Sequence, residues 1–307
     1  MDARVADRVH LYRDLSAASA ALAAHVEERA WTAVRSRGRF TWVLSGGSTP
    51  RTLYRILARR PARSFPWRRT EVFFADERCV PPGDPQSNYG NAQAELLDQV
   101  PIPRAQVHRL EGEVRPMARA AASYARMLGV PPAGPPGRRR PRFDLVLLGL
   151  GEDGHTASLF PNSAALRARR RAVVSVARPG QPPFVPRLTL TLPTLGDSRE
   201  VCFLVAGTSK ARAVARVLRS SLGGTAAVPA SLVRSYGPLE WYLDRAAAAT
   251  LAKAMAPPEP PLGRADAALG RARRGRPVRG ARSSRPARSA AAAVRDRSPE
   301  ARSRAGV

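Results

Sequence analysis

The stretch "FDLVLLGLGEDGHTASLFP", residues 143–161, joins an apolar run to a loop rich in glycine. The apolar run is the longest strand candidate in the chain, and its continuous hydrophobicity is typical of a strand buried on both faces. Gly149, Gly151 and Gly154 then spell G-x-G-x-x-G, the pattern of a dinucleotide-binding turn. The stretch therefore raises the question of whether its loop binds a nucleotide or presents His155.

Three features of the same stretch argue against a nucleotide site. Glu152 and Asp153 place negative charge inside the loop, where they would repel a pyrophosphate. No acidic residue occurs between His155 and Gly196, so the ribose-binding carboxylate expected about 20 residues on is missing. Pro161 comes too early for the long helix that should follow. We therefore predict a glycine-rich loop in which Asp153 orients His155, as in a pair of base and orienting carboxylate.

Apolar strand candidates alternate with helix candidates along the first three quarters of the chain. The strand candidates are residues 9–12, 40–45, 71–75, 143–149, 171–177, 187–192 and 200–207. The expected helices are an Ala-rich helix from Asp14 to Gly38, one that Pro50 opens, residues 210–220, and an amphipathic helix over 239–255. This alternation predicts an α/β fold with a largely parallel sheet flanked by helices.

Two segments lack the composition of regular structure. Residues 129–143 hold too much Pro and Gly, so we expect an exposed loop. Residues 256–307 are rich in Arg, Ala and Pro and have almost no large apolar side chains, which predicts a disordered tail. The expected organisation is one domain over residues 1–255 followed by this tail.

The composition limits the classes of partner. The 307 residues carry a formal net charge of +27, almost all of it from arginine, which favours anionic partners. Specific nucleic-acid binding is not expected, because no aromatic residues are interleaved with the Arg-rich tail. The chain starts with polar residues, lacks a membrane-spanning run and has two cysteines, Cys79 and Cys202. These features predict a cytoplasmic protein without membrane contact. We also expect a monomer.

Two further segments follow strand candidates, and ligands of open parallel sheets bind beyond the carboxyl ends of the strands. Gly46, Gly47, Ser48 and Thr49 precede a helix and form a candidate phosphate cradle, although the ending of a P-loop is absent. The second segment, Asp76-Glu77-Arg78, is interpreted as a loop. Its charged side chains would meet a polar substrate or remain on the surface.

Three more polar residues could complete the site. Asn88, next to Ser87, starts the next helix or turns into the same cleft. Arg187 and Lys210 each lie at the edge of a strand and could add cations to the phosphate cradle. The remaining histidines, His10, His25 and His108, are treated as structural or surface residues, and the sequence shows no recognisable metal ligand set.

Taken together, these segments resemble the 6-phosphogluconolactonase family over roughly residues 9–255. The matching stretches are "LSGGSTPRTLY", "FFADERCVPPGDPQSNYGNA", "FDLVLLGLGEDGHTASLFP", "RLTLTLPTL", "VCFLVAGTSKA" and "GPLEWYLDRAAA". The resemblance implies a Rossmann-like fold of the glucosamine-6-phosphate isomerase superfamily, with no metal or nucleotide required. It also implies hydrolysis of 6-phospho-D-glucono-1,5-lactone to 6-phospho-D-gluconate in the oxidative pentose phosphate pathway.

The resemblance assigns roles to individual residues. It implies that His155 is the general base on water. The 6-phosphate would contact Gly46, Gly47, Ser48, Thr49, Arg187 and Lys210, while Asp76 and Arg78 would meet the ring end. Arg78 at the developing oxyanion is our own hypothesis, based on its charge and its position.

Two alternatives remain open at this point. Glucosamine-6-phosphate deaminases share the Gly-Ser-Thr-Pro cradle, but their relay has a Glu where this chain has Phe160. A non-catalytic sugar-phosphate sensor would keep the cradle, yet it would have no reason to keep Asp153 and His155. It should also carry a DNA-reading module, and none is recognisable in the sequence.

Overall fold

Six parallel strands form the central sheet, in the order β1-β9-β8-β5-β2-β3. In that order they are Arg8–Tyr12, Leu239–Asp244, Val201–Val205, Leu145–Leu148, Phe40–Leu44 and Thr70–Phe74. β5 is buried along its whole length, as its continuous apolar run predicts. The predicted α/β fold with a mostly parallel sheet is confirmed.

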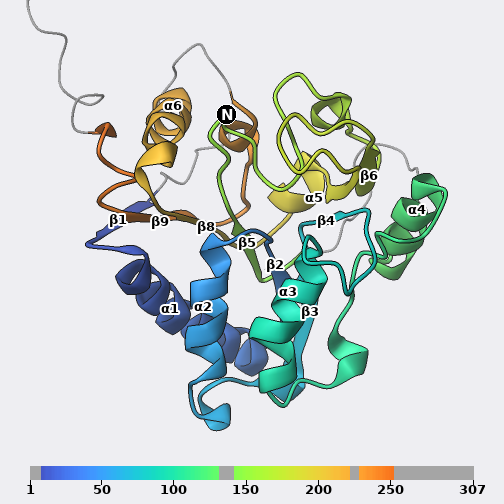
Figure 1. Cartoon of the computed structure of the whole chain (residues 1–307). Helices are drawn as coiled ribbons and strands as arrows, with labels where there is room; N and C mark the ends of the chain where they lie inside the picture. Colours follow the sequence, from blue (N-terminus) through green and yellow to red (C-terminus); the bar gives the residue numbers. More distant parts are fainter. Residues whose placement is uncertain (1–7, 131–141, 222–227, 252–307) are drawn as a thin grey trace, which may run out of the picture. The chain divides into compact units, whose positions relative to one another are not determined.

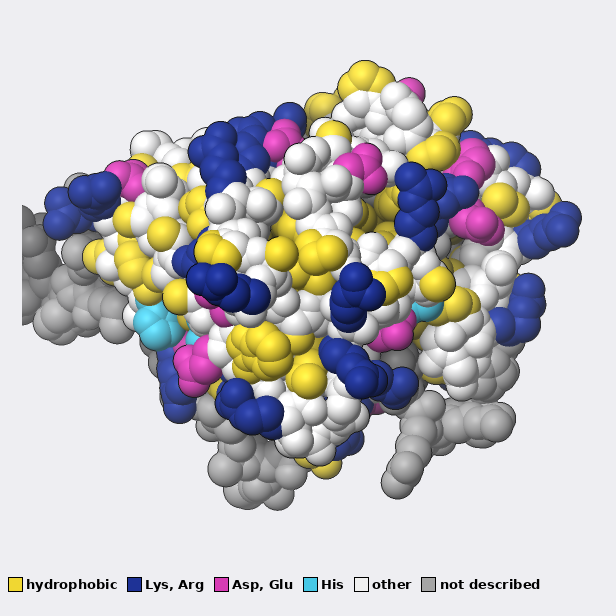
Figure 2. Space-filling view, turned by 90° about the horizontal axis from the view of Figure 1, so that it is seen from below, with side chains coloured by type: hydrophobic (Ala, Val, Ile, Leu, Met, Phe, Trp, Pro, Cys, Tyr) yellow, Lys and Arg dark blue, Asp and Glu magenta, His cyan; other side chains and the backbone are white. Residues whose placement is uncertain are grey.

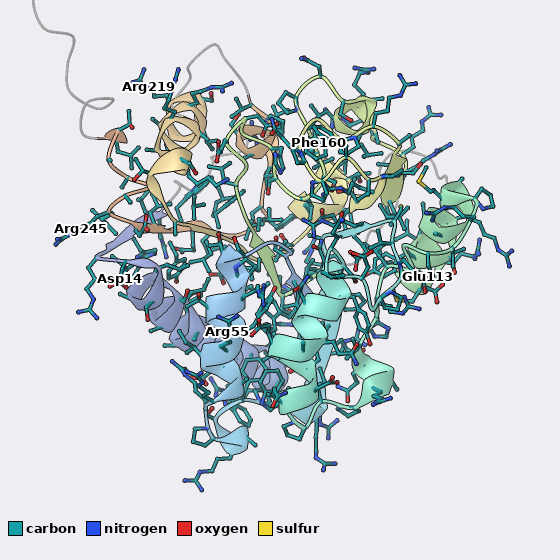
Figure 3. The ribbon with its side chains drawn as sticks, in the orientation of Figure 1. Asp14, Arg55, Glu113, Phe160, Arg219 and Arg245 are labelled. Atoms are coloured by element: carbon teal, nitrogen blue, oxygen red, sulfur yellow. The ribbon has the colours of Figure 1, made fainter. Side chains whose placement is uncertain are left out.

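Helices cover both faces of this sheet (Figure 1). The helices α1, Leu15–Arg37, and α2, Thr49–Ala58, lie on one face, and α6, Ala211–Ser221, lies on the other. The remaining helices are α3, Asn88–Glu95, α4, Met117–Met127, and α5, Leu192–Gly196. Asp14 lies at the start of α1 (Figure 3) and accepts a 2.8 Å hydrogen bond from the Ala17 amide. Gly38 ends α1 with a φ of 77°, so both predicted caps are confirmed.

The computed structural model describes residues 8–130, 142–221 and 228–251. The chain divides into two units, 1–257 and 258–307, and the second lies outside the described residues. The predicted tail and most of the predicted loop 129–143 lie outside them too, so the boundary at 255, the disorder of the tail and the exposure of that loop stay predictions. No helix among the described residues is long and apolar enough to cross a membrane.

A second sheet of three antiparallel strands lies beside the first, in the order β4-β7-β6. Its strands are β4, Asp76–Arg78, β7, Arg187–Leu190, and β6, Val173–Val176. The interpretation of Asp76-Glu77-Arg78 as a loop is therefore wrong. A loop pattern cannot reveal β4, because this short strand exists only through its pairing with the distant β7. β6 and β7 pair antiparallel because no crossover helix separates them.

The expected amphipathic helix over 239–255 is also wrong where the structure describes it. Residues 239–244 form β9, which pairs with β8 on one side and β1 on the other, and all six of its residues are buried. Pairing on both sides satisfies the backbone of β9, so the sheet overrides the helical pattern of the Ala-rich continuation. Residues 252–255 lie outside the described part of the chain.

The strand order reverses between β2 and β5. From β2 the chain moves outward to β3, whereas from β5 it moves in the opposite direction to β8 and then β9. The loops that leave β2 and β5 therefore emerge side by side at the carboxyl edge of the sheet. Such a reversal opens a crevice where ligands of α/β proteins bind.

The buried aromatic residues of β9 supply a test of its place in the sheet. Trp241 is fully buried and stacks on Phe203 of β8 with ring centroids 4.0 Å apart. Trp241→Ala should lower the free energy of unfolding by about 3–5 kcal/mol in chemical denaturation, because it leaves a cavity between sheet and helices. The control Leu11→Ala, on the exposed side of β1, should lower it by less than about 1 kcal/mol. Equal losses would contradict the assignment of β9.

Candidate active site

A cavity of about 190 Å³ lies where the loops after β2 and β5 meet. It is lined by Ser45, Gly46, Gly47, Ser48, Thr49, Pro50, Asp76, Arg78, Asn88, Gly149, Leu150, Gly151, His155, Thr156, Ala157, Arg187 and Lys210. All the predicted substrate-binding residues are among them, together with His155 and Arg78. Asp153 is not part of the lining and contacts His155 from behind. The structure thus brings together residues from six separate segments of the chain.

His155 and Asp153 form a hydrogen-bonded pair. Asp153 Oδ1 lies 2.6 Å from His155 Nδ1 and also accepts a 3.0 Å hydrogen bond from the His155 amide. Burial raises the pKa of the Asp153 carboxyl, but the hydrogen bonds from His155 outweigh this effect and hold the pKa below its usual range. An ionised Asp153 accepts a hydrogen bond from Nδ1–H, so Nε2 is the acceptor nitrogen of the neutral ring. The expected orienting role of Asp153 matches this geometry.

Gly151 and Phe160 hold the His155 ring between them. A Cβ atom on Gly151 would come within 2.0 Å of His155 Nδ1, so only glycine leaves room for the ring. The Phe160 ring lies 4.6 Å from the imidazole, measured between centroids. In the sequence, Phe160 stands out only as the residue in place of the deaminase glutamate. The glycine pattern that resembles a nucleotide turn thus serves to seat a histidine.

The segment after β2 approaches its neighbours closely. A Cβ atom on Gly46 would lie 1.8 Å from Asn88 Oδ1, and Gly47 has a φ of 96°, so both positions require glycine. Ser48 is the N-cap of α2, but its side chain makes no capping hydrogen bond. The Tyr54 hydroxyl fixes the segment from behind, because it donates to the Ser45 carbonyl at 2.7 Å and accepts from the Ser45 amide.

Asp76 is buried at the cavity wall and is held by two neighbours. Ser158 Oγ donates a 2.6 Å hydrogen bond to Asp76 Oδ2, and Asn88 Nδ2 donates to the Asp76 carbonyl at 2.9 Å. Asn88 Oδ1 is buried and has no hydrogen-bond partner among the described residues, so it is free to accept from a ligand. Ser158 was missed by the sequence analysis, because no local pattern connects it with an aspartate 82 positions earlier.

Arg78 and Arg187 stand directly opposite each other in the β4–β7 pairing. Like charges at such a position destabilise a sheet unless an anion compensates them. Burial lowers the pKa of the Arg187 guanidinium; the nearby Asp76 charge raises it, and the Arg78 charge lowers it again. Arg187 donates to the carbonyls of Pro183 and Val185, and Arg78 Nη1 donates to the Gln86 carbonyl at 2.6 Å. Backbone contacts thus hold both cations at the cavity.

Lys210 completes the cationic side of the cavity. It ends a short turn, Thr208–Lys210, that follows β8, and α6 begins at the next residue. Its Nζ lies 3.9 Å from the exposed carboxylate of Glu152, beyond hydrogen-bond distance. Its charge therefore remains open to an anionic ligand.

Glu77 has a structural role instead of a place at the cavity. Its carboxylate accepts hydrogen bonds from the amides of Arg78, Asn88 and Tyr89 and from the Ser87 hydroxyl. Burial raises the pKa of Glu77, and these backbone donors oppose the rise. The carboxylate thereby fixes the start of α3 and, with it, the position of Asn88.

The other three histidines each contact a glutamate outside the cavity: His10 with Glu240, His25 with Glu200, and His108 with Glu71. Among the described residues, His25, Glu200 and Cys202 bring one metal-ligating atom each within 4.8 Å of one another. Arg29 Nε lies 2.7 Å from the second oxygen of Glu200, and its positive charge opposes a metal ion at that carboxylate.

Comparison with known proteins identifies the family of this chain. The model of the family described as glucosamine-6-phosphate isomerases/6-phosphogluconolactonase matches residues 13–241. The chain belongs to this family. It is 38% identical to the 6-phosphogluconolactonase of Streptomyces coelicolor over 81% of this chain and 96% of that protein. It is 40% identical to the human 6-phosphogluconolactonase over 76% of this chain and 89% of the relative. The predicted resemblance is confirmed.

Solved structures give the same result. The 6-phosphogluconolactonase of Trypanosoma brucei superposes with a TM-score of 0.70 at 29% identity, over 80% of this chain and 98% of that one. A monomeric glucosamine-6-phosphate deaminase superposes with a TM-score of 0.64, over 79% of this chain and 99% of that one. Its identity of 19% shows a shared fold alone.

The contact between Gly151 and the His155 ring can be tested directly. Gly151→Ala should displace the ring and change the histidine's NMR signals and titration while the chain stays folded, because its methyl group would overlap Nδ1. Gly83→Ala is the matched control, since a Cβ there meets nothing within 4 Å. If the His155 signals of Gly151→Ala matched those of the parent chain, the proposed seat of the ring would be wrong.

Proposed function

We propose that this chain hydrolyses 6-phospho-D-glucono-1,5-lactone to 6-phospho-D-gluconate, with His155 as the general base on water. The observation that carries the proposal is a single cavity that combines the Asp153-oriented His155 with the cations Arg78, Arg187 and Lys210. Relatives named 6-phosphogluconolactonase, matched over 88% or more of the length of the cyanobacterial, actinobacterial and human proteins, support it.

The base is the Nε2 atom of His155. Nδ1 is occupied by Asp153, so the lone pair on Nε2 accepts a proton as water attacks the lactone carbonyl. Breaking the bond between the carbonyl carbon and the ring oxygen opens the lactone. The imidazolium returns its proton to the leaving oxygen, and Asp153 stabilises the charged ring in the meantime. The reaction consumes one water and needs no other reactant.

The two ends of the substrate call for different partners. The 6-phosphate contacts the segment Gly46, Gly47, Ser48 and Thr49 at the start of α2, and Arg187 and Lys210 supply positive charge. At the ring end, Arg78 stabilises the oxyanion that forms on the carbonyl oxygen. Asp76, fixed by Ser158 and Asn88, accepts hydrogen bonds from sugar hydroxyls. Asn88 Oδ1 provides a further acceptor at the same end.

The geometry offers no support for the deaminase alternative. In the position where the deaminase relay has a glutamate, Phe160 packs its ring on His155 and cannot accept a proton. A sensor without turnover leaves the Asp153–His155 pair without a role. A monomer in the cytoplasm, acting on a sugar-phosphate lactone without specific nucleic-acid binding, completes the proposal.

Replacement of the base should abolish catalysis without loss of the fold. His155→Ala should lower kcat about 10²- to 10⁴-fold, the usual contribution of general base catalysis. The rate is measured by generating the lactone in situ and coupling its product to 6-phosphogluconate oxidation. Enzyme-free hydrolysis is subtracted, and His10→Ala is the control because His10 contacts Glu240 on another strand. A parent rate equal to spontaneous hydrolysis would refute the proposed reaction.

Replacement of Arg78 and replacement of Lys210 should change different kinetic constants. Arg78→Ala should lower kcat, because its charge acts on an oxyanion that exists only in the transition state. Lys210→Ala should mainly raise KM, because the 6-phosphate is bound equally in substrate and transition state. The same coupled assay measures both variants. A raised KM with unchanged kcat for Arg78→Ala would show that Arg78 binds the substrate and does not stabilise the oxyanion.

A further inference from the structure

A second cationic hollow, of about 710 Å³, lies at the amino edge of the parallel sheet, opposite the candidate active site. Six arginines line it: Arg37, Arg39, Arg68, Arg69, Arg142 and Arg199. Only two acidic residues, Glu71 and Asp144, line the same hollow, so its net charge is strongly positive. None of these residues belongs to the cavity with His155.

The fold arranges four of these arginines in a row. Arg199, Arg142, Arg39 and Arg69 lie just before β8, β5, β2 and β3, and these four strands are consecutive neighbours in the sheet. Neighbouring strands are about 4.8 Å apart, so the row extends along the sheet edge in steps of that size. No stretch of sequence contains this row, because its members come from four distant segments.

The two acidic residues are already engaged. The Asp144 carboxylate accepts from Arg37 at 2.7 Å and from the Thr41 amide at 2.8 Å, and Arg199 Nε lies 3.3 Å away. Glu71 Oε2 lies 2.5 Å from His108 Nε2. Among the described residues, neither carboxylate forms an ion pair with Arg39, Arg68 or Arg69.

Three of the arginines have no counterion within the part of the chain that the structure describes. The side chains of Arg39, Arg68 and Arg69 are exposed and make no hydrogen bond or ion pair with another described residue. Three uncompensated guanidinium groups around one hollow repel one another, and a bound anion would remove that repulsion. Because guanidinium groups match phosphoryl oxygens in a bidentate geometry, phosphoryl groups are suitable counterions.

We propose that this hollow is a binding site for a small ligand that carries two or more phosphoryl groups. A single phosphate reaches only part of a row that spans four strands, whereas linked phosphoryl groups contact several arginines together. The lining contains no aromatic side chain on which nucleic-acid bases could stack, so a small molecule fits better than a single strand. The ligand is independent of the lactone, since the two sites lie at opposite edges of the sheet.

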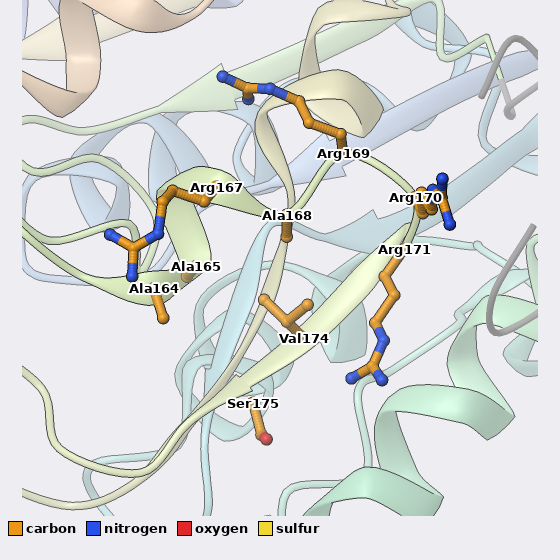
Figure 4. A pocket seen from close by; sticks show the side chains of 9 residues that line it. All are labelled: Ala164, Ala165, Arg167, Ala168, Arg169, Arg170, Arg171, Val174 and Ser175. Atoms are coloured by element: carbon orange, nitrogen blue, oxygen red, sulfur yellow. The ribbon is translucent and has the colours of Figure 1, made fainter. Parts of the chain in front are cut away.

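Basic side chains alone do not define such a site on this chain. Figure 2 shows Lys and Arg side chains in several separate groups over the face seen from below, in keeping with the net charge of +27. Another hollow, of about 520 Å³, is lined by residues 164–175 and includes four arginines. Figure 4 shows that their guanidinium groups point away from one another. Variants of that hollow therefore serve as a control: they remove the same number of positive charges from arginines that do not point toward a common centre.

The test compares two triple variants of the full chain by calorimetric titration with inorganic tripolyphosphate at about 0.15 M ionic strength. The first carries Arg39→Ala, Arg68→Ala and Arg69→Ala, which leaves the Asp144 contacts intact. The second carries Arg167→Ala, Arg170→Ala and Arg171→Ala and loses the same charge. We expect the first to bind at least tenfold more weakly than the parent, and the second less than twofold more weakly. The lactonase rate of the first variant should remain that of the parent chain.

Further titrations distinguish binding at the hollow from binding at other anion sites. Binding should persist in Lys210→Ala, because Lys210 belongs to the candidate active site. The proposal would be overturned if both triple variants lost the same affinity for tripolyphosphate, or if the parent did not bind it. It would also be overturned if Lys210→Ala abolished binding while the first triple variant kept it. An oligothymidine strand that binds through Arg39, Arg68 and Arg69 more tightly than tripolyphosphate would also overturn it, in favour of a nucleic acid.

Discussion

The parallel pairing of β2 with β5 is the constraint on which the candidate site depends. Trp42 pairs with Leu145 and Val43 with Val146, and these buried strands lie next to each other although about 100 residues separate them. From β2 the chain adds β3 on one side of this pair, and from β5 it adds β8 and then β9 on the other side. For this reason the loop after β2 and the loop after β5 meet at one point, and the phosphate segment faces the histidine loop across a small cavity. If the two strands were not adjacent, neither loop would form a site.

Within that cavity, close packing decides the chemistry. The His155 ring lies against Gly151 at a distance that excludes any side chain, and Phe160 covers it from another side. Asp153 is held ionised by the hydrogen bonds that it accepts from His155. A ring fixed in this way offers one nitrogen to the cavity, which reduces the reorganisation that proton transfer would otherwise require.

The positive charge of the chain is concentrated at two places in the fold, which the composition alone does not reveal. At the carboxyl edge, Arg78 and Arg187 are forced together by strand register and are neutralised only in part by Asp76. At the amino edge, arginines that precede consecutive strands meet around a second hollow. In both places the positive charge of distant segments is concentrated by sheet pairing. A net charge of +27 spread evenly over a surface would produce neither concentration.

The sequence by itself determined the features that depend on neighbouring residues. The apolar run in residues 143–149 indicated a buried strand, Asp14 and Gly38 indicated the ends of α1, and the acids within the glycine loop indicated a histidine site. Such patterns are local, so they can be recognised without knowledge of the fold. They predicted the α/β class, and every residue predicted to bind the substrate lines the cavity.

Only the tertiary structure decided the features that depend on pairing between distant segments. β9 is a strand because β1 and β8 satisfy its backbone on both sides, although its Ala-rich continuation suggests a helix. β4 exists only against β7, and the bond from Ser158 to Asp76 joins residues that no spacing connects. The physical reason is the same in each case: hydrogen bonds and burial between remote segments outweigh the weak preferences of short stretches of chain.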